Sequence, residues 1–283
     1  MVSGYAERRC MVLKSLFWSL PHDIRRRVFM LSMPSKFNEL QAYRQAGPES
    51  EYSLRPFDET KSIFFHIPKC AGTSVASALY GRRVGNKDGN HLTVGWGQLT
   101  FDEETYNTYF KFAFVRNPWD RLASAYHFVK AGGMSEADRI WGETVLSRFS
   151  SFDDFVKRWV TEKNVTNIGE GLEKTRVVFA PQYGFVCLRG SKIPAVDFIG
   201  SFENIKTDFA HVAETIGVQV ALDFLNVSNK SQRSYLDEYT DESRSIVADV
   251  YRTDIEMFGY DFENSRAPKA ISVAQRPDIQ PAR

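Results

Sequence analysis

A run of apolar residues that leads into a polar loop containing glycine, and then into a helical pattern, constrains this chain most. Residues 63–67, Ile-Phe-Phe-His-Ile, are typical of a buried strand. Residues 73–80, after the loop, predict a helix that ends at Gly81. A buried strand that turns directly into a helix is half of a β-α-β unit, and such units build parallel sheets.

The same order recurs twice. Residues 112–115 predict a second strand, followed by a helix over 120–129 with Asp120 as its N-cap. Residues 196–200 predict a third strand, followed by a helix around 209–216. We therefore predict an α/β protein, a P-loop-like three-layer fold with a central, mostly parallel sheet flanked by helices.

The pattern divides the chain into three parts. Residues 1–58 predict a helical extension and linker. In this extension the basic run 25–27 adjoins apolar residues, and this amphipathic helix either contacts a membrane surface or partner or packs on the main domain. Residues 59–262 predict the main domain, which includes a final helix from Thr240 to Gly259. Residues 263–283 contain three prolines and no periodicity, and we predict a disordered tail.

Charge and composition exclude several classes of protein. The chain has 36 Lys and Arg against 35 Asp and Glu, a net charge of +1, which argues against a nucleic-acid-binding protein with a broad basic face. Three scattered cysteines suit neither a disulfide framework nor a zinc site, and favour a reducing compartment. No apolar stretch approaches the roughly 20 residues that a transmembrane helix needs. We therefore expect no transmembrane segment.

The loop after the first strand predicts an anion site. It places backbone N–H groups and a helix N-terminus at one point, which favours a phosphate. The candidate residues are Lys69, Cys70, Ala71, Gly72, Thr73 and Ser74. The alternative is a plain strand-to-helix turn that contains a lysine. The loop is not a Walker A motif, because Lys69 precedes the glycine and no lysine precedes Thr73.

A second anion site is expected after the second strand. Arg116 stands at the carboxyl end of that strand, and Ser124 lies in the following helix. An arginine and a hydroxyl in these places can converge on one phosphate. For Arg121 we expect a structural ion pair rather than a ligand contact.

These residues carry a resemblance to a known family. Residues 65–74, Phe-His-Ile-Pro-Lys-Cys-Ala-Gly-Thr-Ser, resemble the 5′-phosphosulfate loop of the carbohydrate sulfotransferases, which include heparan sulfate 2-O- and chondroitin or dermatan sulfotransferases and bacterial relatives. Residues 115–126, Val-Arg-Asn-Pro-Trp-Asp-Arg-Leu-Ala-Ser-Ala-Tyr, resemble the family's 3′-phosphate motif. The resemblance continues through 180–183, 197–204 and 239–260.

The resemblance implies 3′-phosphoadenosine-5′-phosphosulfate as sulfate donor, a carbohydrate or other hydroxyl acceptor, and no metal. It implies that Lys69 and the residues up to Ser74 hold the 5′-phosphosulfate, and that Arg116 and Ser124 hold the 3′-phosphate. It also implies that Arg233, in a late loop, covers the nucleotide. Animal members are usually anchored in the Golgi by an N-terminal transmembrane helix. Since no such helix is expected here, we predict a cytoplasmic enzyme, with peripheral membrane association through its N-terminal basic segment as the alternative.

Transfer to an alcohol needs a base, and a histidine is a suitable type. His91 lies between the two phosphate motifs, where relatives carry a catalytic histidine, and we predict it as the base. The alternatives are a carboxylate such as Asp102 or Glu103, or a His91 that only binds the acceptor. Two other functions remain open: an enzyme that transfers phosphate, and a catalytically silent nucleotide-binding protein of the same fold.

Overall fold

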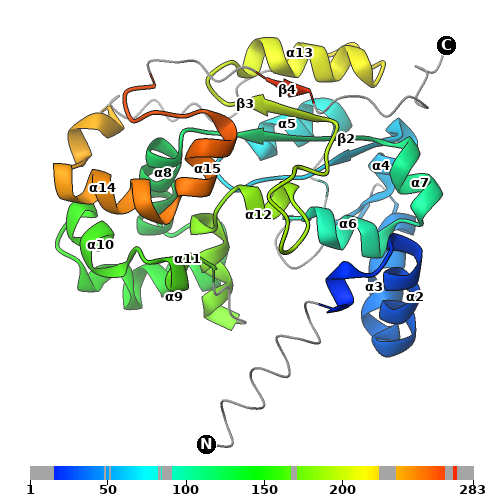
Figure 1. Ribbon diagram of the computed structural model, residues 1–283, viewed down its shortest axis with the longest axis horizontal. Helices are drawn as coiled ribbons and strands as arrows, with labels where there is room; N and C mark the ends of the chain where they lie inside the picture. The colour runs from blue at the N-terminus through cyan, green and yellow to red at the C-terminus, as the bar shows by residue number, and fades with distance from the viewer. Residues whose placement is uncertain are drawn as a thin grey trace, which may run out of the picture.

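A four-stranded sheet organises the chain. The computed structural model describes residues 16–47, 49–50, 52–81, 84, 91–166, 171–222, 234–264 and 270–272. The strands are β1 (Ser62–Phe64), β2 (Phe110–Val115), β3 (Phe198–Ser201) and β4 (Ile271–Ser272), paired in that order (Figure 1). The first three run parallel, and β4 pairs antiparallel with β3. The predicted α/β fold with a mostly parallel sheet is therefore confirmed.

The register of the parallel strands brings three loops to one edge of the sheet. Phe64 of β1 pairs with Phe112 of β2, and Val115 pairs with Ser201 of β3. Phe65 extends the first ladder, because its N–H donates to the carbonyl of Phe112. Since ligands bind outside the carboxyl ends of such strands, this edge is where a site is expected.

Helices fill most of the rest of the described chain. The α-helices are α2 (His22–Ser32), α3 (Pro34–Gln45), α4 (Arg55–Thr60), α5 (Gly72–Tyr80), α6 (Val94–Thr100), α7 (Glu103–Thr108), α8 (Pro118–Lys130), α9 (Glu136–Thr144), α10 (Phe152–Trp159), α11 (Glu162–Thr166), α12 (Tyr183–Val186), α13 (Ile205–Thr215), α14 (Asp241–Val250) and α15 (Arg252–Phe258). Three 3₁₀-helices, η1 (Leu146–Arg148), η2 (Gly171–Phe179) and η3 (Tyr235–Glu238), join them.

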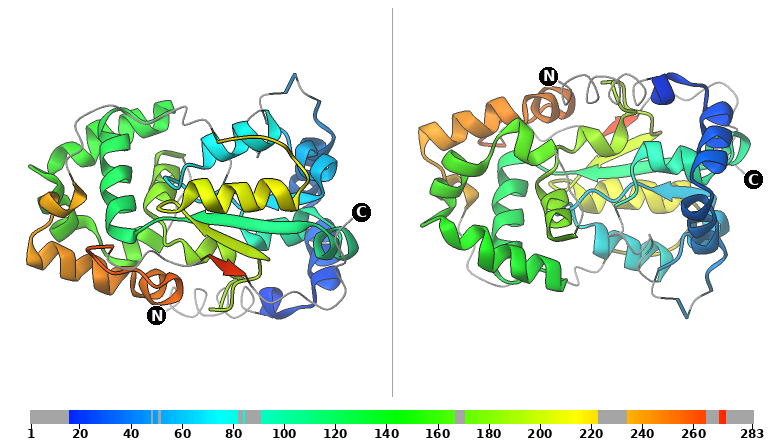
Figure 2. Two further views of the ribbon diagram at one scale, coloured as in Figure 1. Left: turned by 90° about the horizontal axis from the view of Figure 1, so that it is seen from above. Right: turned by 90° about the horizontal axis from the view of Figure 1, so that it is seen from below.

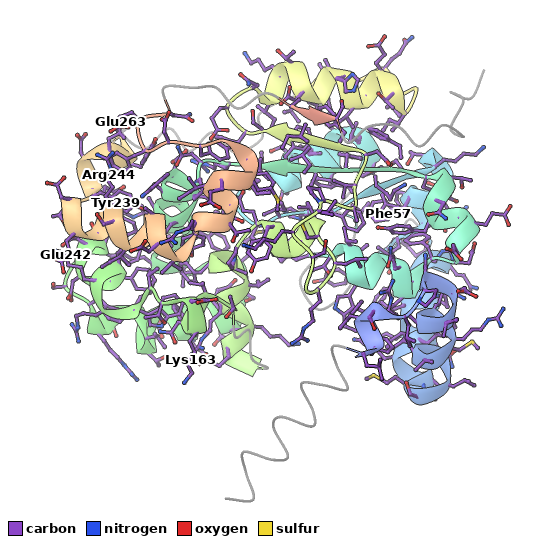
Figure 3. All side chains as sticks on the ribbon, in the orientation of Figure 1. Phe57, Lys163, Tyr239, Glu242, Arg244 and Glu263 are labelled. Carbon is purple, nitrogen blue, oxygen red and sulfur yellow. The ribbon has the colours of Figure 1, made fainter. Side chains whose placement is uncertain are left out.

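Two apolar cores lie side by side. The sheet core contains the buried strand residues, with α13 on one side of the sheet and α6 and α12 on the other (Figures 1 and 2). Helices α8, α9, α10 and α14 form a second core, rich in tryptophan and phenylalanine, beyond the carboxyl end of β2. Tyr239 lies in this helical lobe, whereas Phe57 lies toward the opposite end of the molecule (Figure 3). The phosphate motifs therefore lie where the sheet meets the lobe.

The N-terminal extension forms a helical hairpin of α2 and α3, which packs through Phe29, Phe37 and Leu40. The predicted helix is present, but the arginines of its basic run, residues 25–27, do not all face solvent. Arg25 faces inward and bonds to the carbonyl of Trp18, while the outward face carries apolar residues such as Leu31. Membrane contact by this helix stays a prediction.

Near the C-terminus the structure refines the sequence pattern. Thr240 caps α14 with a capping box, and Gly259 ends α15 in the left-handed region. The single predicted helix is two helices, because the chain turns at Tyr251. Tyr251 is buried, and its hydroxyl donates to the carbonyl of Phe179 in the helical lobe. Strand β4 lies in the C-terminal segment, where the sequence shows no periodicity.

Candidate active site

The loop after β1 leaves the first turn of α5 open. Lys69 and Ala71 adopt left-handed conformations, with φ of 68° and 60°, which costs roughly 1–2 kcal/mol per residue. Ala71 is the N-cap position and supplies no side-chain hydrogen bond. The amides of residues 72–74 have no hydrogen-bond partner among the described residues, and the hydroxyls of Thr73 and Ser74 lie beside them. Free amides at a helix N-terminus attract an anion.

Gly72 is required by the packing of the loop rather than by its backbone angle. A Cβ atom at this position would lie 1.8 Å from Cδ2 of His66 and 2.0 Å from its Nε2. The His66 ring stacks on Phe64, with 5.7 Å between the ring centroids, so it has a packed neighbour on its other side. The loop therefore follows the His66 ring closely, and only glycine fits here.

Lys69 lies on the lobe side of this loop. Its Nζ is 3.9 Å from the ring centroid of Phe128 in α8, which is a cation–π contact. Burial lowers the pKa of the Lys69 ammonium from its usual value near 10.5 to about 8, and the charges of Arg116 and Arg121 act in the same direction. The group is still mostly protonated at neutral pH, so it brings a mobile positive charge to the open amides.

Arg116 follows β2 and ties both phosphate motifs together. Its Nε and Nη2 donate to the carboxylate of Asp120 at 2.8 Å, and its Nη1 donates to the carbonyl of Lys69 at 3.2 Å. The guanidinium lies 4.2 Å from the ring centroid of Phe202. A guanidinium has five N–H donors. One N–H on each Nη atom is thus left for a ligand among the described residues.

The helix that follows Arg116 starts differently from the prediction. Asp120 is not the N-cap of α8. Asn117 is the cap, because its Oδ1 accepts from the N–H of Trp119 at 3.0 Å. Pro118 then occupies the first turn, where its missing N–H costs nothing. Asp120 lies within the first turn and pairs with Arg116 instead.

Ser124 lies on the same face of α8 as Phe128, four residues on. Because Phe128 contacts the Lys69 ammonium, this face of the helix is turned toward the loop. The Ser124 side chain is half-buried, and its hydroxyl has no hydrogen-bond partner among the described residues. The structure thus brings Ser124 to the side of the loop where Lys69 lies.

His91 lies against the same loop. Its Nδ1 is 3.2 Å from the carbonyl oxygen of His66, and the two imidazole rings meet edge to face at 4.7 Å. Since a carbonyl only accepts, Nδ1 carries the proton and Nε2 keeps its lone pair. Burial lowers the pKa of His91 to about 4, so the ring is neutral at neutral pH.

The carboxylates considered as alternative bases have other partners. Asp102 caps α7 and accepts from both the N–H and the hydroxyl of Thr105. Glu103 is in the first turn of α7, and its charge acts on His22 of α2. Neither is brought to the phosphate loop. Arg233 lies outside the described residues.

Two supports of the site have no signal in the sequence beyond the family resemblance. The side-chain amide of Gln182 pairs with the backbone of Arg116, as a neighbouring strand would. Its Nε2 donates to the carbonyl of Arg116, and its Oε1 accepts from the Arg116 N–H, both at 2.9 Å. Asp254 is fully buried and accepts from the N–H groups of Gln182 and Tyr183. Burial raises the pKa of the Asp254 carboxyl to about 6. Arg121 is also structural, but it bonds to carbonyls rather than to a carboxylate.

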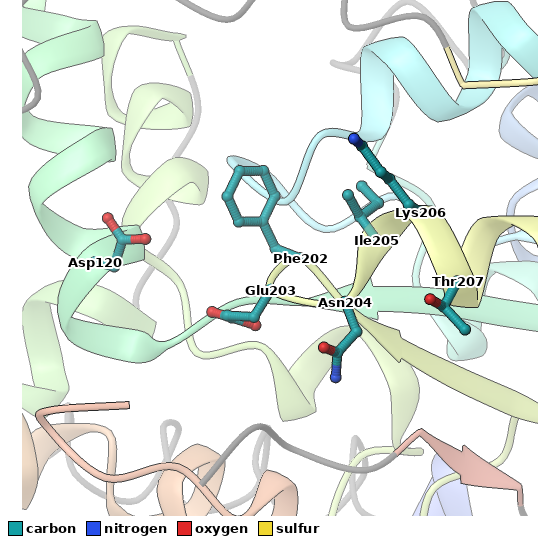
Figure 4. A pocket seen from close by; sticks show the side chains of 7 residues that line it. All are labelled: Asp120, Phe202, Glu203, Asn204, Ile205, Lys206 and Thr207. Carbon is teal, nitrogen blue, oxygen red and sulfur yellow. The ribbon is translucent and has the colours of Figure 1, made fainter. Parts of the chain in front are cut away.

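A cavity of about 460 Å³ lies next to Arg116 (Figure 4). Asp120 and Phe202, both of which contact the Arg116 guanidinium, form part of its wall. Its other lining residues are Glu203, Asn204, Ile205, Lys206 and Thr207. Glu203 is fixed by hydrogen bonds from the N–H of Asn117 and the hydroxyl of Tyr260. In the described residues no cluster of three or more His, Cys, Asp or Glu side chains is arranged to hold a metal ion.

Comparison with known proteins gives animal and archaeal relatives. The chain is 22% identical over 273 residues to carbohydrate sulfotransferase 9 of Homo sapiens, a match that covers 83% of this chain and 59% of the human protein. It is 25% identical over 259 residues to carbohydrate sulfotransferase 14 of Danio rerio, covering 77% and 68%. An uncharacterized protein of Archaeoglobus fulgidus is 30% identical over 122 residues, covering 43% and 78%. No solved structure matches significantly.

The prediction of a cytoplasmic enzyme is wrong. The two named relatives are carbohydrate sulfotransferases of animals, the group whose members the resemblance associates with the Golgi membrane. Within the described ranges, the structure contains no helix that is both long and apolar enough to span a bilayer.

A family model also matches most of the chain. The model of the sulfotransferase family matches residues 54–261. This range includes both phosphate motifs, His91, Gln182 and Asp254. This range is most of the chain and contains β1, β2 and β3. The resemblance seen in the sequence is therefore confirmed, and the chain belongs to the sulfotransferase family.

Proposed function

We propose that this protein transfers a sulfuryl group from 3′-phosphoadenosine-5′-phosphosulfate to a hydroxyl of a carbohydrate acceptor. One observation carries the proposal: the open amides of α5, the Lys69 ammonium and the Arg116 guanidinium lie at one edge of the sheet. The names of the two animal relatives support a carbohydrate acceptor.

The residues present fit a donor with two separate phosphate positions. The amides of residues 72–74 have no hydrogen-bond partner among the described residues, and together with the Thr73 and Ser74 hydroxyls they suit the 5′-phosphosulfate. The remaining N–H groups of Arg116 and the Ser124 hydroxyl suit the 3′-phosphate. When bound, the donor supplies an activated sulfuryl group. The assignment of Arg233 to the nucleotide stays part of this proposal.

The Lys69 ammonium stabilises the leaving group. In an in-line transfer the acceptor oxygen forms a bond to sulfur while the bond from sulfur to the bridging phosphate oxygen breaks, so negative charge develops on that oxygen. Lys69 leads into the amides that bind the phosphate, and it carries its charge in a buried place, where electrostatic stabilisation is strong.

His91 takes the proton of the acceptor hydroxyl. The hydrogen bond from Nδ1 to the His66 carbonyl fixes the ring, and the neutral Nε2 is the free proton acceptor. Because the pKa is about 4, this nitrogen is unprotonated from about pH 5 upward, while Lys69 is charged below pH 8. The two groups thus hold opposite protonation states from pH 5 to pH 7, as an acid–base pair requires.

Thermal unfolding with two nucleotides tests the proposal. We expect 3′,5′-adenosine bisphosphate to stabilise the protein by about 2.7 kcal/mol at a hundred times its Kd, and ATP with magnesium to have little effect. A preference for ATP with magnesium would contradict the proposed donor. Binding of the bisphosphate without transfer from labelled donor to any of a panel of glycans would favour a silent nucleotide-binding protein.

A further inference from the structure

Arg121 is the most deeply buried arginine next to the proposed donor site. It lies in the second turn of α8 and is 1% exposed. Its Nε donates to the carbonyl of Pro68 at 2.9 Å, and its Nη2 donates to the carbonyl of Val178 at 3.2 Å. It makes no ion pair with a carboxylate in the part of the chain that the structure describes. Buried arginines are normally paired, so this arrangement needs a reason.

The two hydrogen bonds of Arg121 act on the orientation of the phosphate loop. The carbonyl of Pro68 and the N–H of Lys69 belong to one trans peptide unit, so they point in opposite directions. Arg121 holds this carbonyl, and Arg116 holds the next one, that of Lys69. Two arginines on adjacent carbonyls thus fix the peptide units that carry the N–H groups of Lys69 and Cys70, directly before the open amides of residues 72–74. These bonds also offset the cost of the left-handed residues in the loop.

The positive charge of Arg121 affects the protonation of both proposed catalytic groups, Lys69 and His91. Its guanidinium contributes to the lowered pKa values of Lys69 and His91, although burial is the larger cause for both. It also acts on the carboxyl of Asp254, which burial holds at a raised pKa. The ionisable groups around Lys69, His91 and Arg121 are His66, Cys70, Arg116, Asp138, Tyr251 and Asp254.

We propose that Arg121 is the positioning residue of the anion site: it aims the phosphate loop, and its buried charge takes the bound anion as its counterion. The inference rests on the proposed function, since that anion is the 5′-phosphosulfate of the donor. It gives Arg121 a role different from that of Arg116, whose guanidinium is already neutralised by Asp120.

The positioning role is tested without any ligand, through Cys70. This thiol is 1% exposed inside the loop, next to Gln182, whereas Cys187 is 4% exposed in a different segment. In Arg121→Met we expect iodoacetamide to modify Cys70 at least tenfold faster, with Cys187 unchanged, as resolved by peptide mass spectrometry. Loss of the Arg121 charge raises the pKa of the Cys70 thiol and by itself slows the reaction, so faster modification reports a loosened loop.

Controls separate loosening from unfolding. The exposed Arg158 pairs with Asp154 on α10, and Arg158→Met should leave the modification rates of both cysteines unchanged. If Arg121→Met increases the modification rates of both cysteines equally, the protein has unfolded globally. Arg121→Lys is then used in its place, because it keeps the buried charge. Unchanged Cys70 reactivity in a folded Arg121 variant would overturn the positioning role.

The electrostatic role is tested with 3′,5′-adenosine bisphosphate and the pH profile. We expect affinity to fall about 30-fold in Arg121→Met and about tenfold in Arg121→Lys. In Arg121→Met the alkaline limb of kcat/KM should move to higher pH, because Lys69 loses a neighbouring positive charge, while in Arg121→Lys it should stay in place. A purely structural brace would lower the rate without moving this limb, and affinities within threefold of wild type would overturn the proposal. If wild type itself does not bind the bisphosphate, the proposed function fails, and Cys70 labelling alone decides whether Arg121 positions the loop.

Discussion

The two strand–helix units, β1 with α5 and β2 with α8, have the same topology but differ in how the N-terminus of the helix is capped. In the unit of β2 and α8 the protein caps the helix end itself: Asn117 accepts from the N–H of Trp119, Pro118 removes one donor and Asp120 adds a negative charge. In the unit of β1 and α5 the cap position is Ala71, whose side chain cannot cap the helix, and the first turn of the helix carries no acidic residue. One helix end is capped by a side chain of the protein itself, whereas the other has no side-chain cap.

The difference assigns tasks to the two units. In the proposed function the uncapped end of α5 receives the 5′-phosphosulfate, and the unit of α8 carries Arg116 and Arg121, which hold the loop. A receptor needs donors whose partners are absent until the ligand binds, and its strain must be offset from elsewhere. If this division is right, substitution of Lys69 acts on activity, whereas removal of the N-cap of α8 acts on stability.

Lys69→Ala should have the largest effect. We expect kcat to fall by about 10³, because the charge on the leaving oxygen loses its stabilising cation. In the wild type, kcat/KM should decrease on the alkaline side with a pKa of about 8 rather than 10.5, since Lys69 is active when protonated. Lys130→Ala is the matched control, because Lys130 also lies over an aromatic ring, that of Tyr126. A Lys69→Ala variant within tenfold of wild type would contradict the receptor role.

His91→Ala should be next in size. We expect kcat to fall by about 10², with the affinity for 3′,5′-adenosine bisphosphate within threefold of wild type, because the ring accepts a proton and does not hold the nucleotide. Substitution of the exposed His211 in α13 should change neither quantity. A parallel loss of affinity in His91→Ala would show that the histidine supports the loop and would place the base elsewhere.

The pH dependence of stability gives a second readout of the same histidine. The pKa of His91 is about 4 in the folded protein and near 6.5 in the unfolded chain, so between these values the unfolded state binds more protons. This contribution to the free energy of unfolding is complete above pH 6.5 and is lost as the pH falls toward 4. Urea titrations at pH 7 and pH 5 should therefore differ more for wild type than for His91→Ala.

Gly72→Ala should cost less in activity and more in stability. The new Cβ atom meets the His66 ring at 1.8 Å, and overpacking of this kind costs roughly 1–3 kcal/mol. Gly184→Ala is the control, because no atom lies within 4 Å of a Cβ built there. The double variant with His66→Ala should recover most of the lost stability in urea titration. Without such recovery, contact with His66 is not what selects glycine.

The sequence predicts the first unit better than the second, for physical reasons. A buried strand, a loop with glycine and hydroxyl residues, and a helix that ends at Gly81 are local patterns, and the structure contains all of them. The N-cap of α8 lies three residues before the position that the sequence pattern predicts. Composition alone does not distinguish Asn117 from Asp120, because both residue types cap helices.

The supports of the site are beyond what periodicity can reveal. Arg121 reaches a carbonyl 53 residues away, Gln182 pairs with a backbone 66 residues away, and Asp254 binds amides more than 70 residues away. Such contacts depend on how the helical lobe closes on the sheet. The resemblance to the family includes Gln182 in its motifs but says nothing of its role. His91 is predicted from its place in the family pattern, while the carbonyl that fixes its tautomer is visible only in the structure.

Asn117→Ala is the smallest expected effect and the sharpest test of the contrast. Loss of the cap and of the hydrogen bond from Nδ2 to the Asp261 carbonyl should lower the free energy of unfolding by about 1–2 kcal/mol. Thr240→Ala, which removes the cap of α14, should cost a similar amount and serves as the control. In both variants the affinity for 3′,5′-adenosine bisphosphate should stay within twofold of wild type, measured by calorimetry. A tenfold loss confined to Asn117→Ala would mean that the capped helix end transmits its geometry to the anion, so receptor and support would no longer be separable.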